Sequence, residues 1–130
     1  MLLRITATAS KLELRFKYRI ESLTRLSFIK VRPYWLINPK TNRRLELDMY
    51  NDPNKLAIEY NGPQHYVYPN YYHKNIKEFK DQLERDKLKE SLCAKNNINL
   101  VIIKSNNDLN HEIDQFYDQI MNLKIDITKC

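Results

Sequence analysis

The stretch that decides the fold is residues 45–66, which read LELDMYNDPNKLAIEYNGPQHY. Apolar and polar residues alternate over residues 44–50 and again over residues 55–60, and this alternation predicts two short strands. Between them, Asn51–Asn54 consists of residues that favour turns. The sequence therefore predicts two antiparallel strands that are joined by a four-residue turn.

This hairpin brings two carboxylates onto one face. With the turn centred within residues 51–54, we expect Asp48 to lie opposite Ala57, with Glu59 as its diagonal neighbour. Side chains alternate with a period of two, so Asp48 and Glu59 would point to the same side. Two converging carboxylates suit a hard divalent cation such as Mg²⁺. The simpler alternative is a solvent-facing acidic surface, which Glu46 would extend.

The rest of the chain predicts helices on either side of a sheet. Apolar residues at spacings of three and four predict amphipathic helices over residues 10–27, 75–95 and 108–123, with Ser10 as the first N-cap. A segment before Pro33 is expected to be extended, and residues 98–103 read as a buried strand. The predicted fold class is α/β, a mixed sheet flanked by helices in the order α-β-β-α-β-α, in one domain over residues 1–130.

The composition favours an intracellular protein with a polyanionic partner. There are 22 basic and 16 acidic residues, a net charge of +6, with a sequence pI near 9.3. Two cysteines, Cys93 and Cys130, suggest neither a disulfide framework nor a zinc cluster, so we expect the cytoplasm or the nucleus. The apolar runs are too short for a membrane span, and Arg4 interrupts the only candidate for a signal peptide. Abundant Asn, Lys and Ile with a single glycine suggest an AT-rich genome, such as a viral one.

Four runs together resemble the PD-(D/E)xK nuclease superfamily, in particular its very-short-patch-repair-like and virus- and phage-borne endonucleases: RRLELDMYN, LAIEYNGPQHY, QLERDKLKESLC and INLVII. The resemblance covers about Phe28 to Ile103. It implies a restriction-endonuclease-like fold and an endonuclease that hydrolyses phosphodiester bonds in DNA with Mg²⁺, or Mn²⁺ in its place. By this similarity Asp48 and Glu59 would hold the metal. The superfamily often adds an acidic residue from its first helix, for which we prefer Glu13 over Glu21.

The chain departs from the superfamily pattern two residues after the glutamate, where Asn61 replaces the usual lysine. Related branches place Gln or His nearby, and this chain offers Gln64 and His65. The lone glycine, Gly62, would turn the chain so that both side chains return over the metal, through a positive φ or by leaving room for a phosphate to approach the backbone. His65 would act as general base or donate to the scissile phosphate. Its structural alternative is a histidine bonded to a loop carbonyl.

The predicted helix over residues 75–95 adds four polar side chains. Spacings of three and four place Gln82, Asp86 and Lys89 on one stripe, with Arg85 beside it. Lys89 or Arg85 would stabilise charge on the phosphate, and Asp86 would orient His65 or a water molecule. The alternative is an ordinary surface ion pair between Asp86 and Lys89.

Cations and aromatic rings flank these motifs and suggest contacts to nucleic acid. Rings can stack on unpaired bases while cations neutralise phosphates, although each ring could equally be packing. The candidates for this binding surface are Arg32, Tyr34, Trp35, Arg43, Arg44, Tyr68, Tyr71 and Arg85. We therefore expect DNA as partner, no membrane, and a homodimer as an option. Two rival hypotheses remain, a catalytically inactive nucleic-acid-binding module and a protein-interaction domain.

Overall fold

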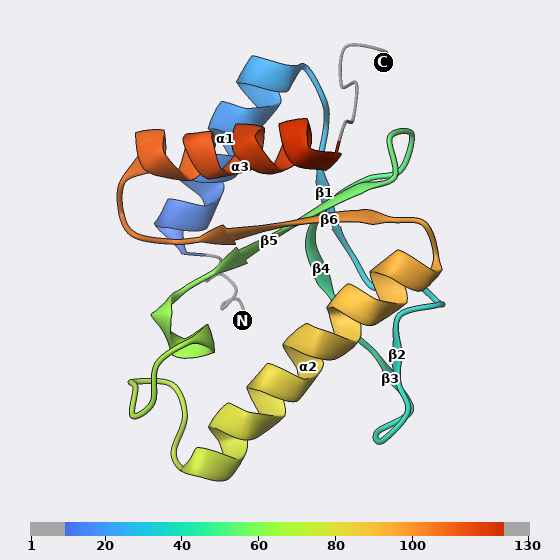
Figure 1. Ribbon diagram of the computed structural model, residues 1–130, viewed down its shortest axis with the longest axis vertical. Coiled ribbons are helices and arrows are strands. Elements are labelled where there is room, and N and C mark those ends of the chain that lie inside the picture. The colour runs from blue at the N-terminus through green and yellow to red at the C-terminus, as the bar shows by residue number, and fades with distance from the viewer. Residues whose placement is uncertain (1–9, 124–130) are drawn as a thin grey trace, which may run out of the picture.

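A computed structural model describes residues 10–123, which form a mixed sheet with helices on both sides (Figure 1). The predicted α/β class is confirmed. The helices are α1 (Lys11–Thr24), α2 (Ile76–Lys95) and α3 (Leu109–Leu123), with a short 3₁₀ helix η2 (Pro63–His65). The strands are β1 (Ile29–Val31), β2 (Ile37–Asn38), β3 (Arg43–Arg44), β4 (Leu47–Asn51), β5 (Leu56–Asn61) and β6 (Asn99–Lys104).

The main sheet has the strand order β1-β4-β5-β6. Its first three strands pair antiparallel, whereas β6 runs parallel to β5 and is reached through α2. Helices α1 and α3 cover one face and α2 lies on the other (Figure 1). The core against α1 and α3 contains Phe16, Ile20, Leu26, Phe28, Met49, Leu56, Ile58, Tyr60, Val101, Ile103, Phe116 and Ile120. The smaller core on the α2 side contains Leu36, Leu47, Tyr50, Ala57, Cys93 and Ile98.

The first half of the chain has more strands than the sequence predicted. The strand expected over residues 44–50 is divided, because Arg44 pairs with Ile37 in the separate β2–β3 hairpin and β4 begins at Leu47. The observed order is therefore α-β-β-β-β-β-α-β-α, with η2 preceding the second helix. The three predicted helices are confirmed. However, two apolar residues of α2, Ile76 and Leu83, are 48% and 36% exposed.

The pairing of β4 corrects the predicted register. Ala57 lies opposite Tyr50, not Asp48, and Ile58 lies opposite Met49. Extending this register by one residue places Asp48 directly across from Glu59. On the other side of β4, the pairing shifts between Ile29 and Val31, so that two residues of β4 face one residue of β1. Such a bulge re-aims side chains and interrupts alternation, which is why Leu47 and Tyr50 enter the same core.

Side-chain caps fix where two helices begin. The Ser10 hydroxyl accepts a hydrogen bond from the Glu13 amide at 3.0 Å, which confirms the predicted cap of α1. The Asn75 side chain accepts from the Glu78 amide at 2.9 Å at the start of α2. The first cap places Glu13 in the opening turn of α1.

The outer edge of β6 is covered by two glutamines of α3. Gln119 accepts from the amide of Ile102 at 3.0 Å and donates to its carbonyl at 2.8 Å. Gln115 bonds the amide and carbonyl of Lys104 in the same way, at 2.8 and 2.9 Å. Each primary amide thus satisfies the two backbone groups that a further strand would pair with. In residues 10–123, no helix is long and apolar enough to cross a membrane.

Candidate active site

Each of the two predicted carboxylates accepts a hydrogen bond from a backbone amide of the opposite strand, β4 or β5. Glu59 Oε2 accepts a hydrogen bond from the Asp48 amide at 2.8 Å, and Asp48 Oδ2 accepts from the Tyr60 amide at 3.0 Å. The backbones of the two strands pair as far as Met49 and Ile58. The carboxylates therefore bridge the strands next to the last backbone pair. Charge-assisted bonds of this kind hold both groups in place.

Lys89 of α2 completes this centre. Its Nζ lies 2.6 Å from Glu59 Oε1, and the Lys89 and Glu59 side chains are only 15% and 7% exposed. The alternative of a surface ion pair between Asp86 and Lys89 is wrong, because Asp86 bonds His65 and Lys89 bonds Glu59. The ammonium group instead reaches the sheet and balances a buried carboxylate, as a buried charge requires.

Burial and mutual repulsion make the carboxyl groups reluctant to ionise together. Burial, followed by the charge of Asp48, raises the pKa of Glu59 to about 7, although Lys89 opposes this shift. Burial also raises the pKa of Asp48, against the effect of the Tyr60 amide. Burial lowers the pKa of Lys89, but Glu59 and Asp48 outweigh it, so the net shift is upward. Carboxyl groups whose pKa values are raised by burial and by a neighbouring charge are typical of functional sites.

A third carboxyl group approaches from α1. Burial, and next the charge of Asp48, raise the pKa of Glu13 to about 7. Its side chain is 15% exposed and lies 3.9 Å from Lys30 of β1. Glu21, the alternative candidate, has a structural role, since its Oε2 accepts from the Phe28 amide at 2.9 Å and positions the chain leading into β1. Of the two acidic residues considered in α1, Glu13 is the one near the centre.

A histidine–aspartate pair stands beside these groups. His65 Nδ1 lies 2.9 Å from Asp86 Oδ2, and both side chains are less than one-fifth exposed. An ionised carboxylate can only accept, so this bond places the proton on Nδ1 and leaves Nε2 as the basic nitrogen. Asp86 is held in turn by Gln82, whose Nε2 donates to Oδ1 at 3.0 Å, and Arg85 donates to Gln82 at 3.1 Å. Through Asp86 and Gln82, the stripe predicted on α2 therefore holds the His65 ring in place.

The lone glycine has an unstrained backbone. Gly62 has φ −78° and ψ 176°, so the predicted positive φ is wrong. The following Pro63 explains this, because a residue before proline is driven to extended conformations. A side chain of the protein lies close to this glycine, and the predicted approach of a phosphate stays a prediction. A Cβ on Gly62 would lie 2.5 Å from Gln64 Oε1, so the absence of a side chain leaves room for the Gln64 amide.

The candidate nucleic-acid contacts divide into packed and exposed groups. Trp35 packs against the α2-side core, and the Tyr68 ring lies 5.6 Å from that of Phe79. Arg32 and Arg44 donate to each other's carbonyl oxygens, at 3.2 and 3.4 Å, which ties β1 to β3. These four side chains therefore help to hold the fold. The exposed group consists of Tyr34 at 74% exposure, Tyr71 at 94%, and the exposed Arg43.

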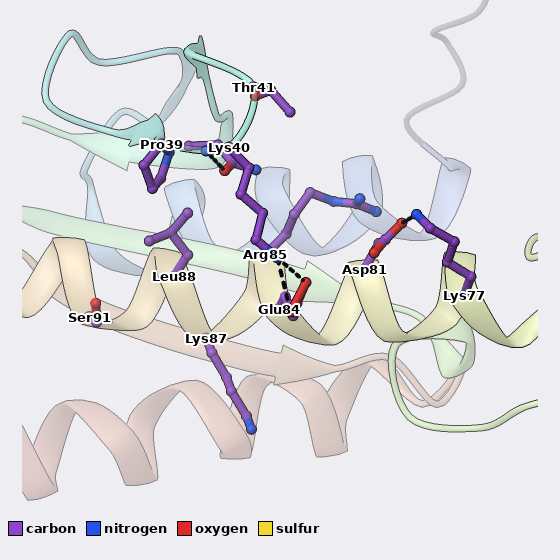
Figure 2. A pocket seen from close by; sticks show the side chains of 11 residues that line it. Pro39, Lys40, Thr41, Lys77, Asp81, Glu84, Arg85, Lys87, Leu88 and Ser91 are labelled. Atoms are coloured by element: carbon purple, nitrogen blue, oxygen red, sulfur yellow. Dashed lines mark hydrogen bonds and ion pairs between the residues drawn. The ribbon is translucent and has the colours of Figure 1, made fainter.

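A groove of about 650 Å³ runs between the β2–β3 turn and α2 (Figure 2). It contains cations from both sides, including Lys40 and Arg85, and the latter connects it to the Gln82–Asp86 chain. Lys40 also forms an ion pair with Glu84 at 3.1 Å, drawn as dashed lines in Figure 2. Asp81 lines the same groove. The groove lining therefore contains four basic and two acidic residues, a mixed but net positive charge like that of the whole chain.

The centre can accept a hard cation, although it offers few ligands. In the part of the chain that the structure describes, no three His, Cys, Asp or Glu side chains are grouped to hold a metal ion. Asp48 uses one carboxylate oxygen for the Tyr60 amide, and the other remains available to a cation. Mg²⁺ commonly binds through one or two carboxylates, with substrate oxygens and water completing its coordination. Asp48 fits that pattern through its remaining oxygen, whereas Glu59 would join a cation beside its bonds to Lys89 at Oε1 and to the Asp48 amide at Oε2.

Sequence reasoning missed the residues that organise the loop after His65. Asn70 bonds the backbone of residues on both sides of it, accepting from the Tyr72 and His73 amides at 2.8 Å and donating to the Val67 carbonyl at 2.8 Å. Asn61 donates to the Tyr66 hydroxyl at 3.2 Å. The only local signal for this role of Asn70 is its place after Pro69 in a loop, since Asn side chains commonly bond backbone groups two residues on.

Comparison with known proteins finds relatives in iridoviruses. The chain is 37% identical over 94 residues to uncharacterized protein 033L of Invertebrate iridescent virus 3, a match that covers 72% of this chain and 48% of the relative. It is 44% identical over 79 residues to uncharacterized protein 307L of Invertebrate iridescent virus 6, covering 57% and 40%. It is also 44% identical over 85 residues to uncharacterized protein 094L of Frog virus 3 (isolate Goorha), covering 65% and 53%.

The chain thus spans about half the length of the curated relatives it matches. No family model matches the chain, and no solved structure matches it.

Proposed function

We propose that this protein is a metal-dependent endonuclease of the restriction-endonuclease-like fold, which hydrolyses phosphodiester bonds in DNA. The observation that carries this proposal is the pair of the half-buried Asp48 and the buried Glu59 on adjacent strands, with Lys89 bonded to Glu59. Burying like charges together opposes folding, so a site that retains them is a candidate for function.

The residues of the centre divide the chemistry between them. A divalent cation such as Mg²⁺, with Mn²⁺ as an alternative, would offset phosphate charge and lower the pKa of the attacking water when held by Asp48 and Glu59. Lys89 keeps Glu59 charge-balanced and has further donors for a phosphate oxygen. His65, with its Nδ1 proton bound by Asp86, can take a proton at Nε2 from the attacking water or return one to the leaving oxygen.

Lys89 also accounts for the departure at the third motif position. Asn61 replaces the usual lysine and bonds Tyr66, and its amide carries no charge. Lys89 brings an ammonium group to the same carboxylate from α2. The replacement at Asn61 is nevertheless the feature that favours the rival hypothesis, a catalytically inactive nucleic-acid-binding module on the same fold.

The decisive experiment is incubation of the purified protein with supercoiled plasmid, linear duplex, single-stranded DNA and RNA, each with Mg²⁺, Mn²⁺ or EDTA. We expect cleavage of DNA that requires the metal and disappears in Asp48→Asn. Salt-sensitive binding without cleavage would favour the inactive binding module, since affinity for phosphates falls as salt rises. Neither binding nor cleavage would favour a protein-interaction domain.

The viral relatives suggest where this activity would operate. All three compared proteins come from iridoviruses. We therefore place the enzyme inside the infected host cell, in the cytoplasm or the nucleus, where viral DNA is the available polyanion. The net charge of +6 suits that partner.

A further inference from the structure

The loop between η2 and α2 presents tyrosine rings that the fold does not use. Tyr71 is 94% exposed and Tyr72 is 68% exposed, and their ring centroids lie 5.6 Å apart in an edge-to-face arrangement. Val67 and Tyr66 in the same loop are 56% and 42% exposed. Single exposed apolar residues are ordinary on protein surfaces, but a contiguous group of them marks a binding surface.

This loop is anchored. The Asn70 side chain accepts from the amides of Tyr72 and His73 and donates to the Val67 carbonyl. Beneath it, the rings of Tyr68 and His73 pack against Phe79 of α2, at 5.6 and 5.8 Å. The exposed rings therefore stand on a backbone that is fixed from both sides, which reduces the entropy lost when a ligand binds them.

The exposed rings are also connected to the candidate active site. Asn70 Nδ2 lies 3.5 Å from the carbonyl oxygen of Gln64, the residue just before His65. The loop leaves β5 at the end of the sheet where η2 begins and leads directly into α2, which carries Asp86 and Lys89 (Figure 1). Asp86 lies ten residues, or about 15 Å, along α2 from Ile76, so a strand seated on Tyr71 would extend along α2 to reach the groups proposed to cleave it.

The charge around the rings selects the class of ligand. Residues 66–81 contain three lysines, Lys74, Lys77 and Lys80, against Glu78 and Asp81, which gives a net charge of +1, with Lys77 paired to Asp81. Lys104 adds a cation 4.9 Å from the Tyr66 ring centroid. Planar rings among cations match a chain of aromatic bases joined by phosphates, which can stack only where the bases are unpaired.

We propose that Tyr71 and Tyr72 form a stacking platform for unpaired bases, so that the preferred substrate of the site is DNA with a single-stranded stretch, such as a flap or a gap. This inference rests on the proposed function and specifies its substrate class. A base pair inside a duplex keeps its faces stacked on its neighbours, and it would have to be opened before it could use the platform.

The test measures binding apart from cleavage, in the Asp48→Asn background and in EDTA. Fluorescence anisotropy would give Kd for a labelled single-stranded 20-mer, the same sequence as duplex, and a duplex with a single-stranded flap. Tyr71→Ala/Tyr72→Ala is compared with Tyr18→Ala, a tyrosine of α1 that is 61% exposed. Unchanged Tm and circular dichroism would establish that both variants fold.

We expect the double substitution to weaken binding of the single strand and the flap by tenfold or more, about 1.4 kcal/mol, with less than a threefold effect on the duplex. Tyr18→Ala should bind all three DNAs like its parent. An equal loss on all three DNAs, or no loss on any, would overturn the platform. Absence of metal-dependent cleavage by the wild-type protein would instead overturn the proposed function, and the binding data would still decide the role of the tyrosines.

Discussion

Replacing Asp48 with asparagine should stabilise the protein while it abolishes cleavage. Asparagine keeps the shape of aspartate and an oxygen that can accept from the Tyr60 amide, as Asp48 Oδ2 does at 3.0 Å. It removes one negative charge from a buried group that also contains Glu59 and Glu13. Lys89 keeps its bond to Glu59, so no ammonium group is left unpaired.

The size of the gain follows from the geometry of the two strands. Residues directly opposite on neighbouring strands have Cβ atoms about 5 Å apart. Two unit charges at about 5 Å repel by about 3 kcal/mol at an effective dielectric constant near 20. Asp48 also attracts Lys89, and this favourable interaction is lost in the variant. We therefore expect a net gain of about 1–2 kcal/mol at pH 8, or roughly 3–8 °C in Tm.

The gain should depend on pH in a defined direction. The pKa values of Glu13 and Glu59 rise from about 4.5 to about 7 on folding. The folded protein therefore holds protons that the unfolded chain has released, and its stability falls as pH rises from 4.5 through 7. At pH 5 the carboxyl groups share protons and repel less, so Asp48→Asn should gain little there.

Thermal unfolding in EDTA at pH 5, 6, 7 and 8 measures this dependence. A second series replaces EDTA with Mg²⁺. The metal should raise the Tm of the wild-type protein most at pH 8 and that of Asp48→Asn hardly at all, since a ligand stabilises only the state that binds it. Asp81→Asn, in an exposed ion pair of α2, serves as control and should unfold at the temperature of the wild type at every pH. A variant less stable than wild type at pH 8, or an equal gain at pH 5 and pH 8, would refute the reasoning.

Three further substitutions test the neighbouring groups. Lys89→Met should destabilise the protein by about 1–3 kcal/mol at pH 8 and by less at pH 5, because it leaves a buried carboxylate without its cation; equal Tm losses at both pH values would contradict this. Asp86→Asn should lower kcat by about 10²-fold or more through His65, with a shifted pH–rate profile and an unchanged Tm, and an unaltered profile would remove the pair from the chemistry. Gly62→Ala should reproduce the kinetic effect of Gln64→Ala, since its Cβ would displace that amide; a fully active Gly62→Ala beside an impaired Gln64→Ala would separate the two residues.

The sequence predicted the hairpin and its two carboxylates because alternation and turn residues are local signals. It misplaced the register because the turn comprises residues 52–55 instead of 51–54, with Lys55 at φ 49°, and no local signal marks a lysine for a positive φ. The β2–β3 hairpin was missed for a similar reason. Its strands have two residues each, too few for any alternation to be recognised.

The polar stripe on α2 was predicted by helical spacing, but its partners were not all found. Asp86 was expected to orient His65, which lies 21 residues earlier in the chain, and the structure contains that pair. The phosphate contact assigned to Lys89 stays a prediction, and its bond to Glu59, 30 residues away, was not predicted. Spacing along one helix states which side chains share a face, and only tertiary packing decides which strand that face meets.

The glutamines of α3 have a consequence for folding and solubility. Until α3 docks, the backbone of β6 at Ile102 and Lys104 has no partner on its outer side, so the strand and the helix should become protected from hydrogen exchange together. An uncovered edge strand is a template for pairing with another chain. Gln115 and Gln119 therefore act against self-association, and a chain that ends before α3 would be expected to aggregate through β6 even though every strand of its sheet is present.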